Sequence, residues 1–180
     1  CGSLLGIALH EGVSYPVGMV DEKNLYPMTY GEFLLANGKE KMEELLRQND
    51  WHLTGMLSNE YIDLLRQYYY VGGMPAAVKA YVEGNGLNAV RTTQKMILKD
   101  YDRDFSKHAP ARIVPKIRMV WQCAVSQLAK ENKKFIFGAM KKGARASEFE
   151  EAIQWLTDAG IIYKVNRVTS VKMPLKFYDE

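Results

Sequence analysis

The sequence Tyr68-Tyr69-Tyr70-Val71-Gly72-Gly73-Met74-Pro75-Ala76-Ala77-Val78 decides how the middle of this 180-residue chain is divided into helices. Glycines 72 and 73 can both adopt a positive φ, whereas proline has a fixed φ and no N–H and so suits the first turn of a helix. We therefore predict that one helix ends at the two glycines and that the next begins near Pro75. The three tyrosines are expected to be core residues rather than a platform for a ligand.

Helical periodicity continues on both sides of this joint. Apolar residues recur at helical spacing in five stretches, which are 42–46, 61–68, 74–81, 87–105 and 117–128. Asn49-Asp50 and Thr54-Gly55 are expected to separate the first two helices, and Pro110 to end the long fourth one. The chain is therefore predicted to be mainly α-helical.

The two ends of the chain have a different pattern. Residues 1–28 are short and extended in character, with a brief strand expected at Leu25–Met28. Near the other end, Ser147 and Glu150 have the spacing of a capping box, Gly160 is expected to cap the helix that follows, and residues 161–165 have strand composition. Helices followed by a strand and a basic loop outline a winged-helix-like unit over residues 111–180.

Composition and charge limit the function classes. The net charge of +3 is small for a dedicated nucleic-acid-binding protein, so any polyanion site must come from local clustering. No apolar run approaches the roughly 20 residues that span a bilayer, which argues against a membrane protein and leads us to expect a cytoplasmic one. The two cysteines, Cys1 and Cys123, lie far apart without a zinc-binding spacing, so neither zinc nor a disulfide is expected.

Six short motifs follow one another along the chain. They are Gly2-Ser3-Leu4-Leu5-Gly6, Ser14-Tyr15-Pro16-Val17-Gly18, Leu25-Tyr26-Pro27-Met28, Phe33-Leu34, Gly72-Gly73-Met74-Pro75 and Lys141-Lys142-Gly143-Ala144-Arg145. In this order they resemble the motifs of prokaryotic AAA-type ATPases that carry a following domain of unknown function. The resemblance covers nearly the whole chain. It implies that residues 1–28 end an α/β ATPase core, that residues 29–110 form a helical lid, and that residues 111–180 form the winged-helix-like unit.

The same resemblance implies which residues bind nucleotide. Gly2 and Ser3 would lie near the outer phosphates of ATP, and Gly73 and Pro75 resemble the Gly-x-Pro signature that brings a proline against the adenine in related nucleotide-switch ATPases. The phosphate-binding pattern GxxxxGK[ST] is absent from this chain, as is an acidic strand that would hold magnesium. ATP and Mg²⁺ are therefore expected to bind an upstream core, and this chain alone is expected to be catalytically inert. The alternative interpretation is that residues 72–75 only join two helices and bind no ligand.

A basic cluster is the other candidate site. Lys133, Lys134, Lys141, Lys142 and Arg145 could contact phosphates, and Phe135 and Phe137 lie among them. The helix expected to enter a DNA groove is acidic, however, and this opposes insertion. The aspartates at 100, 102 and 104 are interleaved with Lys and Arg and are expected to form a salt-bridged helix surface rather than a metal site.

We interpret the chain as the C-terminal part of an AAA-type ATPase, which would act as an ATP-dependent conformational switch towards an unknown protein partner. Two alternatives stay open. One is a winged-helix regulator that binds DNA, and the other is a protein-interaction module that does not use nucleotide. Duplex binding that depends on salt would favour the first alternative.

Overall fold

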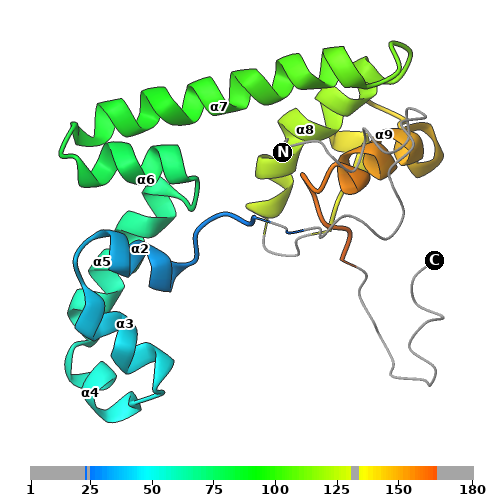
Figure 1. Ribbon diagram of the computed structural model, residues 1–180. Helices are drawn as coiled ribbons and strands as arrows, with labels where there is room; N and C mark the ends of the chain where they lie inside the picture. Colours follow the sequence, from blue (N-terminus) through cyan, green and yellow to red (C-terminus); the bar gives the residue numbers. More distant parts are fainter. Residues whose placement is uncertain (1–22, 24, 131–133, 166–180) are drawn as a thin grey trace, which may run out of the picture. The chain divides into compact units, whose positions relative to one another are not determined.

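The computed structural model describes residue 23, residues 25–130 and residues 134–165. These residues are mainly α-helical, as predicted, and none of them lies in a β-strand. The elements in chain order are α2 (Tyr30–Ala36), α3 (Glu40–Arg47), α4 (Trp51–Met56), α5 (Ser58–Val71), α6 (Pro75–Val82), α7 (Gly86–His108), α8 (Val114–Leu128), the short 3-10 helix η1 (Phe137–Ala139) and α9 (Ala146–Asp158) (Figure 1).

The chain forms two compact units, and the boundary between them falls within α7. The described residues up to Tyr101 belong to the first unit, and those from Asp102 onward belong to the second unit. In the first unit, α2 packs against α3, α5 and α6. In the second unit, α8 packs against α9. Most of the ATPase-core segment expected at residues 1–28 lies outside the described residues.

The core of the first unit is built around α2. Phe33 and Leu34 are fully buried and contribute to two neighbouring apolar clusters, one with α5, α6 and α7 and the other with α3 and α5. Thr29 begins α2 with a capping box, in which its hydroxyl accepts from the Glu32 N–H and the Glu32 carboxylate accepts from the Thr29 N–H. Helix α2 is thus fixed at its start and buried on one face.

Several local predictions are confirmed and others are wrong. The long helix α7 ends before Pro110, as expected, and α8 has Pro115 in its first turn. Thr54 and Gly55 do not separate two helices, because both residues lie inside α4. Leu25–Met28 is not a strand, and neither are residues 161–165. A strand needs a neighbouring strand to hold its backbone groups, and the described residues supply none.

The second unit is closed by a buried amide and by aromatic rings. The Gln127 side chain accepts from the Ile136 N–H (3.2 Å) and donates to the Ile136 carbonyl (2.9 Å), which ties the segment before η1 to α8. Phe105 is fully buried and meets the rings of Trp121 and Trp155 edge to face. The residues that hold the second unit together therefore come from α7, α8 and α9.

The end of helix α9 was predicted correctly from the sequence, but its start was not. The predicted capping box at Ser147 is wrong, because α9 begins at Ala146 and Ser147 is already inside its first turn; the N-cap is Arg145, which makes no side-chain cap hydrogen bond. The prediction for Gly160 is confirmed. Its φ is 68°, and the N–H groups of Gly160 and Ile161 donate to the carbonyls of Thr157 and Leu156.

Candidate functional site

The joint between α5 and α6 has the predicted form. Gly72 ends α5 with a φ of 75°, which a residue with a side chain rarely adopts, and Pro75 is the first residue of α6. The last carbonyls of α5 have partners, because the Gln94 side chain donates to Tyr70 O (2.7 Å) and to Val71 O (3.0 Å). The joint is therefore a defined structure and not a simple break between helices.

Only one of the three tyrosines before the joint packs inward. The Tyr68 ring contacts the rings of Tyr30 and Phe33, whereas Tyr69 is 75% exposed and Tyr70 is 45% exposed. Successive residues of a helix point about 100° apart, so three in a row cannot share one face. The prediction that all three are core residues is thus wrong for Tyr69 and Tyr70.

The segment that precedes α2 lies against this joint. The Met28 N–H donates to the Gly73 carbonyl (2.7 Å), and the Tyr68 hydroxyl donates to the Met28 carbonyl (2.7 Å). A Cβ added to Gly73 would come within 2.3 Å of Met28 O and 3.1 Å of Pro27 Cβ. Gly73 is therefore required for this close approach, although its own φ is not positive.

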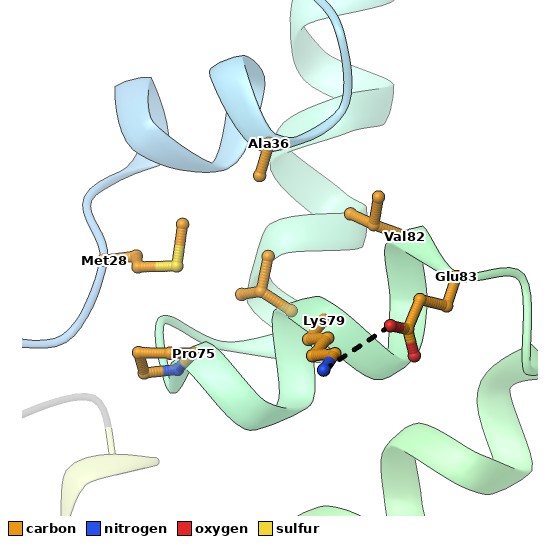
Figure 2. A pocket seen from close by; sticks show the side chains of 7 residues that line it. Met28, Ala36, Pro75, Lys79, Val82 and Glu83 are labelled. Carbon is orange, nitrogen blue, oxygen red and sulfur yellow. Dashed lines mark ion pairs between the residues drawn. The ribbon is translucent and has the colours of Figure 1, made fainter.

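A shallow apolar groove lies beside Pro75, and we call it the Pro75 groove. Its volume is about 310 Å³, and it is lined by Met28, Ala36, Pro75, Val78, Lys79, Val82 and Glu83. Figure 2 shows the Met28 and Pro75 side chains at one end of the groove and those of Val82 and Glu83 at the other. The Lys79 ammonium lies 3.7 Å from the Glu83 carboxylate, so one ion pair is present on an otherwise apolar surface.

This arrangement can hold a flat apolar group. Proline, methionine and valine side chains offer contact area, and the Lys79–Glu83 pair offers one donor group and one acceptor group at the edge. The shape and the apolar lining of the groove suit the binding of such a group.

The comparisons with known proteins concern most of this chain. The family described as "Domain of unknown function (DUF8612)" matches residues 62–179, which is more than half of the sequence. The chain belongs to the DUF8612 family. A search of curated proteins found no match, and a search of solved structures found none either. The DUF8612 match includes α6 and the basic loop described below, whereas Met28 and Ala36 precede it.

The predicted nucleotide-binding residues are placed only in part. Pro75 lines the groove, while Gly73 does not, because Met28 occupies the space next to it. Gly2 and Ser3 lie outside the described residues. The other lining residues were not predicted as site residues from the sequence; they are Met28, Ala36, Val78, Lys79, Val82 and Glu83. Three of these could have been found from the helical spacing i, i+3, i+4 and i+7 that starts at Pro75, whereas Met28 and Ala36 carried no such signal.

The second candidate site of this DUF8612 chain is the loop before α9, which we call the basic loop (residues 141–145). The side chains of Lys141, Lys142 and Arg145 are all exposed, and no ion pair of theirs is found among the described residues. Of the other predicted phosphate-contacting residues, Lys134 is described and exposed, and Lys133 is not described. The second unit therefore presents at least three uncompensated positive charges within five residues.

Two acidic side chains of the second unit are paired with arginines. Asp102 accepts two hydrogen bonds from Arg118 (2.8 and 3.0 Å), and Glu151 on α9 is bound by both terminal nitrogens of Arg112. Asp102 thus binds a neighbouring helix instead of pairing along α7. In the part of the chain that the structure describes, no three His, Cys, Asp or Glu side chains are grouped as metal ligands, and no helix is both long and apolar enough to cross a membrane.

Proposed function

We propose that this DUF8612 chain is the C-terminal part of an AAA-type ATPase and that the Pro75 groove receives the adenine of ATP. The observation that carries the proposal is the position of Pro75, which is exposed at the start of α6 and forms one end of an apolar groove. The order of the six sequence motifs supports it independently.

The chemistry of the groove suits a purine base. A rigid proline ring and the Met28 and Val82 side chains can pack on the flat faces of adenine, which gains free energy as apolar surface leaves water. The base has both donor and acceptor groups on its edge, and Glu83 and Lys79 could bind one of each kind. A groove of about 310 Å³ is at the small end of ligand sites, so it would hold the base but not the whole nucleotide.

The phosphates and Mg²⁺ would be bound by an upstream core, because this sequence has no P-loop. In that protein, the α2–α6 region would act as a helical lid that senses the base, and hydrolysis would switch the position of the lid. The 180-residue chain alone would hydrolyse no ATP, which a colorimetric phosphate assay can check. Turnover that survives purification and disappears on mutation within this chain would contradict the proposal.

The decisive experiment measures ATP affinity by calorimetry in a form of the protein that includes the upstream sequence. Pro75→Ala should weaken binding by about 1 kcal/mol, roughly fivefold, because apolar contact area is lost. Ala76→Ser is the matched control, since Ala76 is exposed on the same helix and does not line the groove. Full ATP affinity in Pro75→Ala would show that the joint has only an architectural role.

A second candidate function, binding of a nucleic-acid backbone, is favoured by the basic loop alone. Lys141 and Lys142 are exposed and not neutralised by described neighbours, so they could contact phosphates in a salt-dependent way. Glu148 and Glu150 follow directly on the exposed surface of α9, and their charge opposes insertion of that helix into a groove. We expect weak binding that is lost at moderate salt.

Fluorescence anisotropy with a DNA duplex tests this second function. Replacing Lys141 and Lys142 by Ala should weaken binding at low salt and lower the slope of log K against log salt by about 2. Replacing the exposed Lys41 and Lys95 of the first unit is the matched control for net charge. Sequence-specific binding that persists at physiological salt would instead rank DNA binding above ATP binding.

A further inference from the structure

Met28 is held at both of its backbone polar groups. Its N–H donates to Gly73 O and its carbonyl accepts from the Tyr68 hydroxyl, each at 2.7 Å. Met28 is not part of a helix or a strand, so these two bonds replace the regular pairing that it lacks. The bonds also determine where the Met28 side chain lies, which is at the Pro75 end of the groove.

Tyr68 is itself well fixed. Its ring centroid lies 5.4 Å from that of Phe33, which is fully buried, and 5.8 Å from that of Tyr30. The Tyr30 hydroxyl donates to Tyr61 O (2.8 Å), so the neighbouring ring is anchored as well. A rigid ring of this kind can hold its hydroxyl in one place with little loss of entropy on bonding.

Gly73 completes the arrangement by the absence of a side chain. Any Cβ at this position would meet Met28 O at 2.3 Å and Met28 N at 3.0 Å, and both of these are backbone atoms that cannot turn away. The Met28 backbone would therefore have to move as a whole. Gly73 and Tyr68 thus act on the same atom, the Met28 carbonyl oxygen, from two sides.

We propose that Tyr68 is a positioning residue for the Pro75 groove: its hydroxyl and the space left by Gly73 hold Met28 in place as the wall next to Pro75. Tyr68 does not line the groove and would act on a ligand only through Met28. This inference rests on the proposed function only where it concerns adenine. The clamping of Met28 itself can be tested without any ligand.

The first experiment measures amide hydrogen exchange in the 180-residue chain by NMR. Tyr68→Phe removes one hydroxyl and keeps the ring, and it should speed exchange of the Met28 N–H about fivefold, the effect of one net hydrogen bond. Gly73→Ala should speed it more. The Val78 N–H, which donates to Met74 O inside α6, serves as the internal reference for general unfolding.

Tyr70→Phe is the matched control, because Tyr70 lies on the same helix and its hydroxyl makes no hydrogen bond within the described residues. It should leave the Met28 exchange rate unchanged. If Tyr68→Phe also leaves that rate unchanged, or if it speeds Met28 and Val78 equally, the positioning role is overturned.

The second experiment titrates ATP into the longer form of the protein. If the wild type binds ATP, Tyr68→Phe should weaken binding severalfold and Tyr70→Phe should not; equal affinity of Tyr68→Phe and wild type would overturn the role of Tyr68 in ligand binding. If the wild type binds no ATP, the proposed function fails while the exchange experiment still decides whether Tyr68 positions Met28.

Discussion

The two units of this chain hold their helices together with different kinds of contact. In the first unit, tyrosine hydroxyls bind single backbone carbonyls: Tyr30 binds Tyr61 O, Tyr61 binds Met42 O, and Tyr68 binds Met28 O. In the second unit, Phe105 packs between two tryptophan rings, the buried Gln127 amide binds the Ile136 backbone, and arginines pair with carboxylates near the surface. Hydrogen bonds fix one atom in direction and distance, whereas ring packing is much less directional.

In the first unit, one of these hydroxyl bonds holds the Met28 wall of the groove. Burial and the nearby Tyr61 and Glu60 raise the pKa of Tyr30 to about 12, which extends to more alkaline pH the range in which its hydroxyl is a donor. Directional bonds of this kind can place a segment such as residues 27–28 that has no regular structure. In the second unit, the Gln127 amide holds Ile136 in a similar way, beside an aromatic core that buries apolar area.

The largest effect is expected from the aromatic core of the second unit. Phe105→Ala should lower the free energy of unfolding by about 3–5 kcal/mol, because a fully buried ring leaves a cavity between two tryptophans. Urea unfolding followed by tryptophan fluorescence measures this. Trp51→Ala, at a side chain that is 67% exposed, is the control and should change stability by less than about 0.5 kcal/mol. Similar losses for both variants would contradict the described core.

A smaller effect is expected from a single hydroxyl in the first unit. Tyr61→Phe should cost about 1 kcal/mol, because the buried Met42 carbonyl loses its side-chain donor. The same urea experiment applies, with the exposed Tyr69→Phe as control. No difference between the two variants would mean that directional bonds do not distinguish the first unit from the second.

The surface ion pair of the second unit should matter less again. Asp102 and Arg118 are each about 40% exposed, so their coupling energy in a double-mutant cycle with Asp102→Ala and Arg118→Ala should stay below about 1 kcal/mol. The coupling should also decrease when salt is added. A coupling of several kcal/mol would show that the second unit depends on its surface ion pairs as much as on its aromatic core.

The smallest effect concerns the start of α2. The Glu32 carboxylate accepts one hydrogen bond from the Thr29 N–H and one from the Thr29 hydroxyl. Both bonds lower the pKa of Glu32, and the bond from the N–H has the larger effect. Because the pKa is lower in the folded state, the stabilisation is present above the ordinary range of glutamate and is lost as the pH falls through the folded-state pKa. Urea unfolding at a series of acidic pH values should show a flatter pH dependence for Glu32→Gln. An unchanged slope would contradict the capping box.

Sequence patterns were reliable where the deciding contacts are local. The joint at Gly72 and Pro75, the long helix α7 and the cap at Gly160 follow from φ preferences and helical spacing within a few residues. The two possible capping boxes show the limit of such patterns. Thr29 and Glu32 form one, and Ser147 and Glu150 do not, although the spacing is the same.

The sequence by itself determined that the chain is mainly helical and that Pro75 begins a helix after a glycine joint, because backbone preferences act over one or two turns. Only the tertiary structure decided that Met28 lies against Gly73 and forms the groove with Pro75. These residues are more than forty positions apart, and the contact depends on space and on a tyrosine hydroxyl that no local pattern encodes.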